Sequence, residues 1–318
     1  MSRSLRDPEP ATDRPVDLDI DGRAVRLTHP DRVVWPASGT TKRDLVDYLL
    51  AVAPVLLPHL RRRAVMLWRF PEGIDGPGWF QAQCRGRPGW VATHAITGRR
   101  GDRLEYCLVE EPATLAWLAN LGTIELHPHG WTIDAPDEPT GVVFDLDPGP
   151  PAGHPAAAAV ALRIRDRLAA DGLACVVKTS GALGLHVVAP LASGAAFSDA
   201  KGYARRVAES LEDETPDLVI ARSDRAARAG RVYVDWIQND RSRQLVAPYS
   251  PRAMPVPQVS TPLRWDEVEA AADGRPVRLR PGFGEVLERI ERFGDLWSAP
   301  ATGRLPDGAV SAPRVPTR

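Results

Sequence analysis

The chain contains two kinds of hydrophobic pattern, and they alternate along most of its length. In some segments apolar residues recur every three or four positions, as expected for a helix with one buried face. In other segments short apolar runs end at glycine, proline or aspartate, which is typical of strands. The helical pattern predicts helices over residues 40–60, 113–122, 156–172, 199–214, 264–274 and 283–294.

Strands are predicted between these helices, often as neighbours joined by a turn. A hairpin with an Asp21-Gly22 turn is expected over residues 16–27. Residues 71–90 are rich in glycine, proline and aromatic residues, so we expect a loop with exposed rings there. Further strands, some with an attached turn, are predicted over residues 64–70, 103–110, 123–133, 142–147, 174–181, 184–191 and 231–239.

The order of these elements predicts an α+β fold, because pairs of strands stand between helices instead of alternating regularly with them. One catalytic domain is expected over residues 16–297. A disordered tail is expected over residues 1–15, and a Pro/Gly-rich tail over residues 298–318. Pro54 is expected to end or kink the first long helix, for which Thr40 or Thr41 is a suitable N-cap.

Acidic residues stand at the ends of two predicted strands. Asp145 and Asp147 follow the apolar run Val142–Phe144, and positions two apart on a strand point to the same side. Either acid could simply be a turn residue. Paired carboxylates repel each other, however, and a divalent cation with a preference for oxygen ligands relieves that repulsion. A third carboxylate, Asp235, could complete a site for two metal ions.

A glycine-rich turn adds a second candidate feature. In the stretch KTSGALGLH, Gly181 and Gly184 would let the backbone approach a ligand closely, and Ser180 offers a hydroxyl group. His186 begins the next predicted strand. The same pattern is also compatible with a plain hairpin, so the turn alone does not define a phosphate site.

Composition limits the classes of protein that need to be considered. The chain has 318 residues, 43% of them hydrophobic, and a net charge of −1, so no overall basic character indicates nucleic-acid binding. The apolar runs are too short to cross a membrane and the polar N-terminus has no secretory pattern, which predicts a cytoplasmic protein. The three cysteines fit neither a zinc spacing nor a disulfide framework, and reduced thiols are expected.

Taken together, the motifs resemble a known family. FDLDPG, TSGxxGxH, VYVDWxQN and VAPYSxR follow one another as in the polymerase domain of bacterial ligase D, a member of the archaeo-eukaryotic primase superfamily that works in non-homologous end joining. The resemblance extends from about residue 25 to about residue 295 and includes LTHPDR, ELHP and STPLRWDEV. It implies a primase-polymerase fold with mixed and antiparallel sheets flanked by helices.

The resemblance also implies a function and a set of site residues. The expected reaction is template-dependent nucleotide addition, with NTP or dNTP substrates, that extends DNA ends or fills a gapped duplex with two Mn²⁺ or Mg²⁺ ions. The resemblance also implies nucleoid association and Ku as a partner. A separate ATP-dependent DNA ligase is expected, because the chain has no K-x-D-G ligase motif. The implied residues are Asp145, Asp147 and Asp235 for metal and catalysis, His127, Ser180, Gly181, His186, Gln238 and Arg252 for the nucleotide, and Arg32, Trp79 and Phe80 for DNA.

Three positions depart from the family pattern. Trp68, Ala82 and Leu183 stand where relatives usually carry a basic residue, so weaker binding of DNA or nucleotide is expected. This leaves open an alternative in which the chain is a weak or inactive DNA-end-binding scaffold. A more remote alternative is a haloacid-dehalogenase-type phosphatase, because FDLD also resembles the nucleophile motif of that family, in which Asp145 would be phosphorylated.

Overall fold

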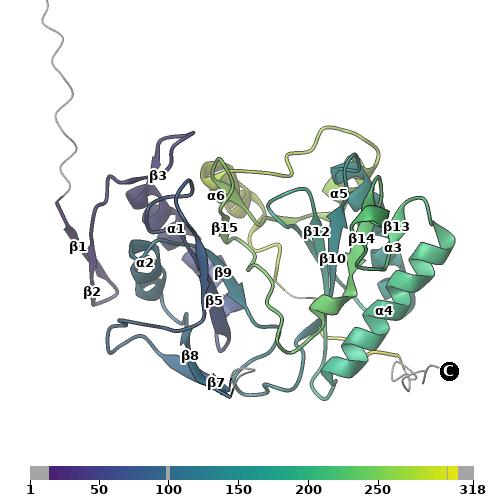
Figure 1. Cartoon of the computed structure of the whole chain (residues 1–318), viewed down its shortest axis with the longest axis horizontal. Helices are drawn as coiled ribbons and strands as arrows, with labels where there is room; N and C mark the ends of the chain where they lie inside the picture. The colour runs from purple at the N-terminus through teal and green to yellow at the C-terminus, as the bar shows by residue number, and fades with distance from the viewer. Residues whose placement is uncertain (1–13, 98–100, 299, 307–318) are drawn as a thin grey trace, which may run out of the picture.

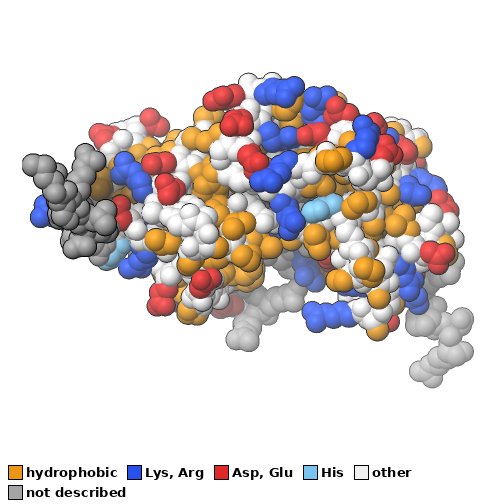
Figure 2. Space-filling view, turned by 90° about the horizontal axis from the view of Figure 1, so that it is seen from above, with side chains coloured by type: hydrophobic (Ala, Val, Ile, Leu, Met, Phe, Trp, Pro, Cys, Tyr) orange, Lys and Arg blue, Asp and Glu red, His pale blue; other side chains and the backbone are white. Residues whose placement is uncertain are grey.

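The computed structural model describes residues 14–97, 101–298 and 300–306. Two β-sheets, each with its own hydrophobic core, lie side by side (Figure 1). The mixture of helices with antiparallel and mixed sheets confirms the predicted α+β class. On the face drawn in Figure 2, acidic and basic side chains are interspersed with apolar ones, in agreement with the small net charge.

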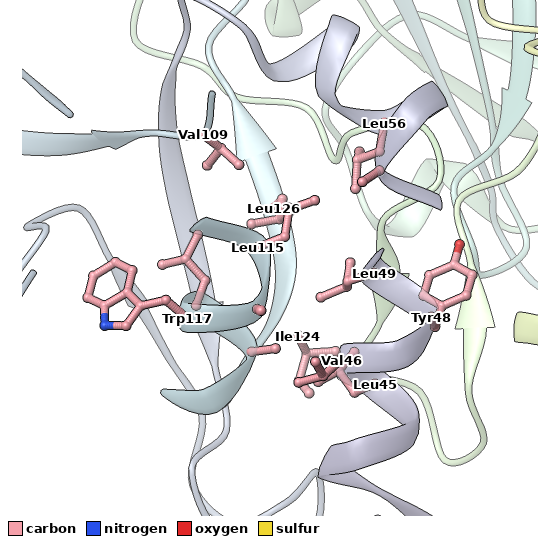
Figure 3. Packing of buried hydrophobic residues seen from close by; sticks show 14 of the residues in the cluster. Leu45, Val46, Tyr48, Leu49, Leu56, Val109, Leu115, Trp117, Ile124 and Leu126 are labelled. Carbon is pink, nitrogen blue, oxygen red and sulfur yellow. The ribbon is translucent and has the colours of Figure 1, made fainter. Parts of the chain in front are cut away.

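The first sheet is built around a central strand, β5, which pairs with β9 on one edge and with β6 and β8 on the other. Helices α1 and α2, and α6 from later in the chain, pack their apolar side chains into the same core. Figure 3 shows how Leu45 and Leu49 of α1 meet Ile124 and Leu126 of β9. The bounds are α1 Lys42–Leu60, β5 Ala64–Arg69, β6 Trp79–Gln81, β7 Thr93–Thr97, β8 Arg103–Leu108, α2 Pro112–Asn120, β9 Thr123–Pro128 and α6 Phe283–Phe293.

The second sheet has the strand order β13-β14-β10-β12-β11-β17, and only the β13–β14 pair is parallel. Helices α3 and α4 pack on β10, where Phe144 and Leu146 are fully buried. Because side chains alternate along a strand, Asp145 and Asp147 point to the opposite face. The bounds are β10 Gly141–Pro148, α3 His154–Ala170, β11 Val176–Thr179, β12 Leu185–Pro190, α4 Phe197–Glu214, β13 Val219–Ile220, β14 Val232–Asp235, β17 Pro262–Leu263 and α5 Trp265–Ala272.

Short elements connect and flank the two sheets. The predicted hairpin over residues 16–27 is present as an antiparallel pair that turns at Asp21 and Gly22. Tyr48 of α1 donates a hydrogen bond to the carbonyl oxygen of Tyr249, which ties the C-terminal part of the chain to the first core. The remaining bounds are β1 Val16–Ile20, β2 Arg23–Leu27, β3 Val33–Trp35, β4 Thr40–Thr41, η1 Ala226–Arg228, η2 Trp236–Gln238, β15 Pro251–Arg252 and β16 Gln258–Val259.

Two local predictions about the first half of the chain need correction. Thr41 caps α1 in a reciprocal arrangement with Asp44, as predicted, but Pro54 lies inside the helix, which continues to Leu60. Burial of one face of α1 in the first core compensates for the hydrogen bond that the proline cannot donate. The segment 71–90 is not entirely loop, because Trp79–Gln81 pairs with β5 as strand β6.

The ends of the chain are only partly described. Residues 1–13 and 307–318, which include most of the expected tails, lie outside the described residues. Within the expected C-terminal tail, Gly303 pairs with Leu191 next to β12, and Leu305 packs against the second core. Among the described residues, no helix combines the length and apolar character needed to cross a membrane.

The prediction of three reduced thiols is wrong for two of them. Cys84, in the segment after β6, forms a disulfide with Cys107 of β8, and Cys175 is free. The two cysteines are 23 positions apart in sequence, but β8 and the segment after β6 bring their Cα atoms within 5.0 Å. The spacing in the sequence contains no sign of this approach, because it depends on how the sheet folds.

We expect reduction of the Cys84–Cys107 disulfide to lower the free energy of unfolding by about 3 kcal/mol, because the bond closes a loop of intermediate length in the unfolded chain. Guanidinium unfolding of the oxidised protein with and without a phosphine reductant measures the difference. A Cys175→Ser variant should respond like the wild type, and a double Cys84→Ser, Cys107→Ser variant should not respond. An equal stability of the oxidised and reduced wild type would contradict the expectation.

Candidate active site

The three predicted acids lie on one face of the second sheet. Strands β10 and β14 are antiparallel, and their register places Asp145 directly opposite Asp235 and Asp147 opposite Tyr233. Directly opposite residues of an antiparallel pair present their side chains to the same face, so all three carboxylates share it. Asp145 lies within β10 instead of after it, since the strand continues to Pro148.

Asp145 is held by groups that favour its charged form. Its Oδ2 accepts a hydrogen bond of 3.0 Å from Gln238, and its Oδ1 lies 3.2 Å from Nε2 of His186 without the angles of a hydrogen bond. Burial acts to raise the pKa of Asp145, but His186, Gln238 and the nearby Lys178 outweigh burial and lower it. Asp145 is therefore ionised in the folded protein.

The other two acids have the opposite shift. Burial and the charge of Asp145 raise the pKa of Asp147 to about 7, although the guanidinium of Arg228 opposes this effect. Burial and Asp145 also raise the pKa of Asp235, although Tyr233 and the backbone N–H of Ile237 donate hydrogen bonds to its Oδ1. The face thus carries more negative charge than its protein surroundings neutralise.

The chemistry of this donor set fits a divalent metal ion. Three carboxylates supply the hard oxygen ligands that such ions prefer, and a cation would favour the charged forms of Asp147 and Asp235, whose pKa values are raised. Within the described part of the chain, no three His, Cys, Asp or Glu side chains form a ready-made metal cluster. A cavity of about 360 Å³ beside Asp147, lined also by Arg225 and Arg228, provides space next to the acids.

Behind Asp145 lies a buried polar chain that the sequence analysis did not identify. Lys178 of β11 is completely buried, and its Nζ donates to Nδ1 of His186 and to Oγ of Ser260, both at 2.7 Å. Because Nδ1 accepts from the lysine, the ring proton of a neutral His186 is on Nε2, which faces Asp145. Burial and the charge of Lys178 lower the pKa of His186 to about 4, so this ring is neutral. The available signal was that Lys178 is one of only three lysines in the chain.

The glycine-rich turn connects β11 to β12 and lies against the acidic strand. Gly181 has a φ of +80°, and a Cβ at this position would meet Cγ of Arg252 at 2.3 Å. A Cβ on Gly184 would meet the carbonyl oxygen of Leu146, in β10, at 2.4 Å. The two glycines therefore allow the turn that carries Ser180 to pack closely on both neighbours.

His127 and Arg252, predicted for the nucleotide, are joined by a residue that was not predicted. Glu125 of β9 is almost completely buried, lies 2.8 Å from His127 Nε2 and 3.2 Å from Nε of Arg252, and accepts a hydrogen bond from the backbone N–H of Ala253. Burial lowers the pKa of His127 despite this acid. Glu125 belongs to the ELHP motif itself, so the motif contained the signal.

The predicted DNA-binding residues lie on the first sheet. Trp79 and Phe80 are among the most exposed large hydrophobic residues, with relative exposures of 45% and 57%. Phe80 stacks on Trp68 and meets the ring of His127 edge-on, which places the aromatic pair next to the nucleotide residues. Arg32 lies in the turn before β3 and donates to the carbonyl oxygen of Pro71, at the start of the segment that leads to β6.

The positions that depart from the family pattern have different surroundings. Leu183 is exposed on the glycine-rich turn, which is compatible with a position that binds phosphate in relatives. Ala82 packs against the small cluster that contains Tyr106 and Trp131, and Trp68 lies among aromatic rings. The weaker binding of DNA and nucleotide expected from these three positions stays a prediction.

Three acids on one face of a sheet, beside a glycine-rich turn, are consistent with a metal-dependent nucleotidyltransferase. The family model of the LigD primase-polymerase domain matches residues 41–297. The chain therefore belongs to the family of LigD primase-polymerase domains.

Relatives and a solved structure agree with this assignment. The chain is 38% identical over 275 residues to the multifunctional non-homologous end joining protein LigD of Mycolicibacterium smegmatis, which covers 86% of this chain and 35% of that protein. It is 27% identical over 274 residues to the bifunctional LigD of Bacillus subtilis, covering 85% and 43% of the two chains. It also resembles the polymerase domain of Mycobacterium tuberculosis ligase D in complex with DNA, with a TM-score of 0.81, 37% identity and coverage of 87% and 99%. The chain thus spans well under half the length of these full-length relatives.

These comparisons confirm the predicted primase-polymerase fold and nucleotidyltransferase class. They do not favour a scaffold protein or a phosphatase of the haloacid-dehalogenase type. The roles of the individual site residues stay predictions.

An Asp147→Asn variant is expected to remove a pH-dependent loss of stability from the metal-free protein. The folded-state pKa is about 7, above the ordinary aspartate value of about 4, so the folded state binds more protons than the unfolded state in this range. The contribution of Asp147 is favourable at low pH, and the free energy of unfolding falls as pH rises through this range, by about 2 kcal/mol between about pH 5 and about pH 8.

Urea unfolding in the presence of EDTA at the two pH values measures this effect. The exposed Asp273, changed to Asn, serves as the matched control and should retain the pH dependence of the wild type. If Asp147→Asn also retains it, the raised pKa of Asp147 is not correct.

Proposed function

We propose that this chain is a template-dependent DNA or RNA polymerase that extends ends or fills gaps during double-strand break repair by non-homologous end joining. The observation that carries the proposal is the common face of Asp145, Asp147 and Asp235, in a chain of the LigD primase-polymerase family. The names of its relatives and the DNA bound to the similar M. tuberculosis domain support the biological setting.

Asp145, Asp147 and Asp235 would hold the metal, which we propose to be a pair of Mn²⁺ or Mg²⁺ ions. Such a pair stabilises the charge on the attacking and leaving oxygens of a phosphoryl transfer. The protein contributes the arrangement of the acids, and Gln238 keeps Asp145 in place through its hydrogen bond. A primer 3′-hydroxyl would attack the α-phosphate of the nucleotide, and pyrophosphate would leave.

The residues around the glycine-rich turn would bind the triphosphate of an NTP or dNTP. Ser180 would supply a hydroxyl group, and Gly181, which has no side chain, allows Arg252 to pack against the turn. Arg252 lies directly behind this turn and supplies a permanent positive charge. His186 and His127 would line the same pocket, with His127 oriented by Glu125.

Trp79 and Phe80 would bind the template strand by stacking on its bases, since a base of any sequence presents an aromatic face. Arg32 would bind DNA phosphate near the same segment. We further propose Ku as a partner that brings the enzyme to a DNA end, and a separate ATP-dependent ligase that seals the filled break.

Replacement of Asp145, Asp147 or Asp235 by Asn is expected to reduce nucleotide addition by at least about 1,000-fold, because each variant removes a charged metal ligand. Primer extension on a gapped duplex with Mn²⁺ measures the rate, and circular dichroism checks the fold. Asp213→Asn, an exposed change on α4, is the matched control and should remain active. Full activity of any one of the three variants would refute the metal assignment.

Trp79→Ala and Phe80→Ala are expected to weaken binding of a gapped duplex by about 1–3 kcal/mol each, the usual range for loss of a base-stacking ring. Fluorescence anisotropy with a labelled duplex measures the affinity. Val256→Ala removes a similarly exposed apolar side chain elsewhere and should bind normally. Unchanged affinity of both aromatic variants would assign the pair a packing role only.

Leu183→Lys is expected to lower the KM for the nucleotide by roughly five- to tenfold, because it adds one charged contact to the triphosphate. Steady-state primer extension at saturating DNA measures KM, and DNA affinity should stay nearly constant. Leu183→Gln, which adds polarity without charge, is the control and should change KM much less. An unchanged KM in Leu183→Lys would show that the triphosphate does not reach this part of the turn.

A further inference from the structure

Trp68 occupies the middle of a row of side chains that crosses the first sheet. In the register of β5 with its neighbours, Trp68 stands directly opposite Phe80 of β6 on one side and Glu125 of β9 on the other. It therefore lies between the exposed aromatic pair and the Glu125–His127 contact. Neither the family assignment nor the proposed function gives this tryptophan a role.

The indole of Trp68 is packed between two other aromatic rings. Its centroid lies 4.9 Å from that of Phe80, with an interplanar angle of 17°, which is a stacked arrangement. On the same strand, the ring of Phe70 lies 5.3 Å away at 50°. We define Phe70, Trp68 and Phe80 as the ring column, because the three rings connect the first core to the surface.

The inner end of the ring column is fixed by the backbone. Phe70 is buried, and its N–H donates to the carbonyl oxygen of Gly122. A Cβ on Gly78 would meet the Phe70 ring at 2.3 Å, so the ring packs directly against the backbone at the start of β6. The outer end is Phe80, which is 57% exposed and also meets His127 edge-on at 5.6 Å. Trp68 is the only link of the ring column between these two ends.

The guanidinium of Arg69, next to Trp68 in β5, is held by other groups of the protein. Arg69, the neighbour of Trp68, donates to the carbonyl oxygen of Leu121 and to Gln81, and its guanidinium lies 5.5 Å from the Trp79 ring. These contacts pair the guanidinium of Arg69 with acceptors and an aromatic ring of the protein itself. A flat ring fixed from behind loses little conformational freedom when a base stacks on its open side, which favours binding through preorganisation.

We propose that Trp68 is a positioning residue for template binding, which holds the Phe80 ring in place so that a base of single-stranded DNA stacks on it with little dependence on salt. This inference rests on the proposed template role of Phe80 and adds the residue that preorganises it. In this proposal Trp68 does not contact the base and acts through Phe80, whose ring stacks on it.

A double-mutant cycle tests this dependence. Trp68→Leu is made alone and together with Phe80→Ala, and the Kd for a labelled gapped duplex with a single-stranded template segment is measured by anisotropy at several salt concentrations. Trp68→Phe tests rescue by a ring, and Trp68→Met is a second non-aromatic variant if the leucine variant does not fold. The control variant Trp265→Leu removes a partly buried tryptophan of α5 that packs against the second core.

With Phe80 present, the non-aromatic variants should raise Kd by about three- to tenfold, the loss expected for an aromatic pair. In the Phe80→Ala background the same change should alter Kd by less than about twofold. The salt dependence of Kd should stay that of the wild type, because no charge is removed. Trp68→Phe should recover most of the affinity, and the KM for the nucleotide should be unchanged.

An equal loss of affinity in both backgrounds would overturn the inference, because Trp68 would then act independently of Phe80. A wild-type Kd in the non-aromatic variants would overturn it as well. If Phe80→Ala alone leaves Kd unchanged, the template role of Phe80 in the proposed function has failed, and the inference fails with it. These results are distinguishable because the Phe80→Ala variant is measured separately.

Discussion

The rest of the site depends on the concentration of negative charge where β10 and β14 pair. Their register puts Asp145 opposite Asp235, with Asp147 on the same face, and the three charges cannot all be stabilised by the protein groups around them. Asp145 accepts a hydrogen bond from Gln238 and lies near His186 and Lys178, which lower its pKa, and its negative charge helps to raise the pKa of Asp147 and Asp235. A bound cation would relieve this repulsion, which is consistent with the metal-dependent nucleotide chemistry that we propose.

The space around the acids is organised by close approaches that only particular residues allow. Gly181 and Gly184 let the turn between β11 and β12 lie on Arg252 and on β10. Glu125 then joins Arg252 of β15 to its neighbour His127 on β9, so a buried carboxylate holds these two residues together. Arg252, which we propose to bind the triphosphate, is therefore held in place by contacts within the protein, and such preorganisation favours catalysis.

The template side of the site uses a different interaction. Its exposed rings are supported by other rings, and the nearest guanidinium, that of Arg69, is occupied by backbone and side-chain acceptors. Stacking depends on contact area and ring orientation, whereas phosphate contacts depend on ionic strength. In the function that we propose, the acid-rich face would therefore supply the electrostatic part of the reaction and the first sheet the apolar part of recognition.

The sequence by itself determined the helices, most strands and the residue types of the site. Periodicity and caps are local properties, and the motifs around Asp145, Ser180 and Asp235 are contiguous, so the α+β class and the family could be recognised from them. The sequence could not determine that α1 continues through Pro54, that Trp79 begins a strand, or that Cys84 meets Cys107. Each of these depends on packing between segments distant in the sequence.

Tertiary structure also decided which buried groups contact and orient the site residues. Lys178 became a partner of His186 because β11 and β12 pair in one particular register, and Glu125 became the link to Arg252 because β15 lies beside β9. Trp68, which stands where relatives usually carry a cation, proved to be the middle ring of a packed column. Local patterns specify what a residue can do, but its partners are set by strand register and burial, which only the folded chain fixes.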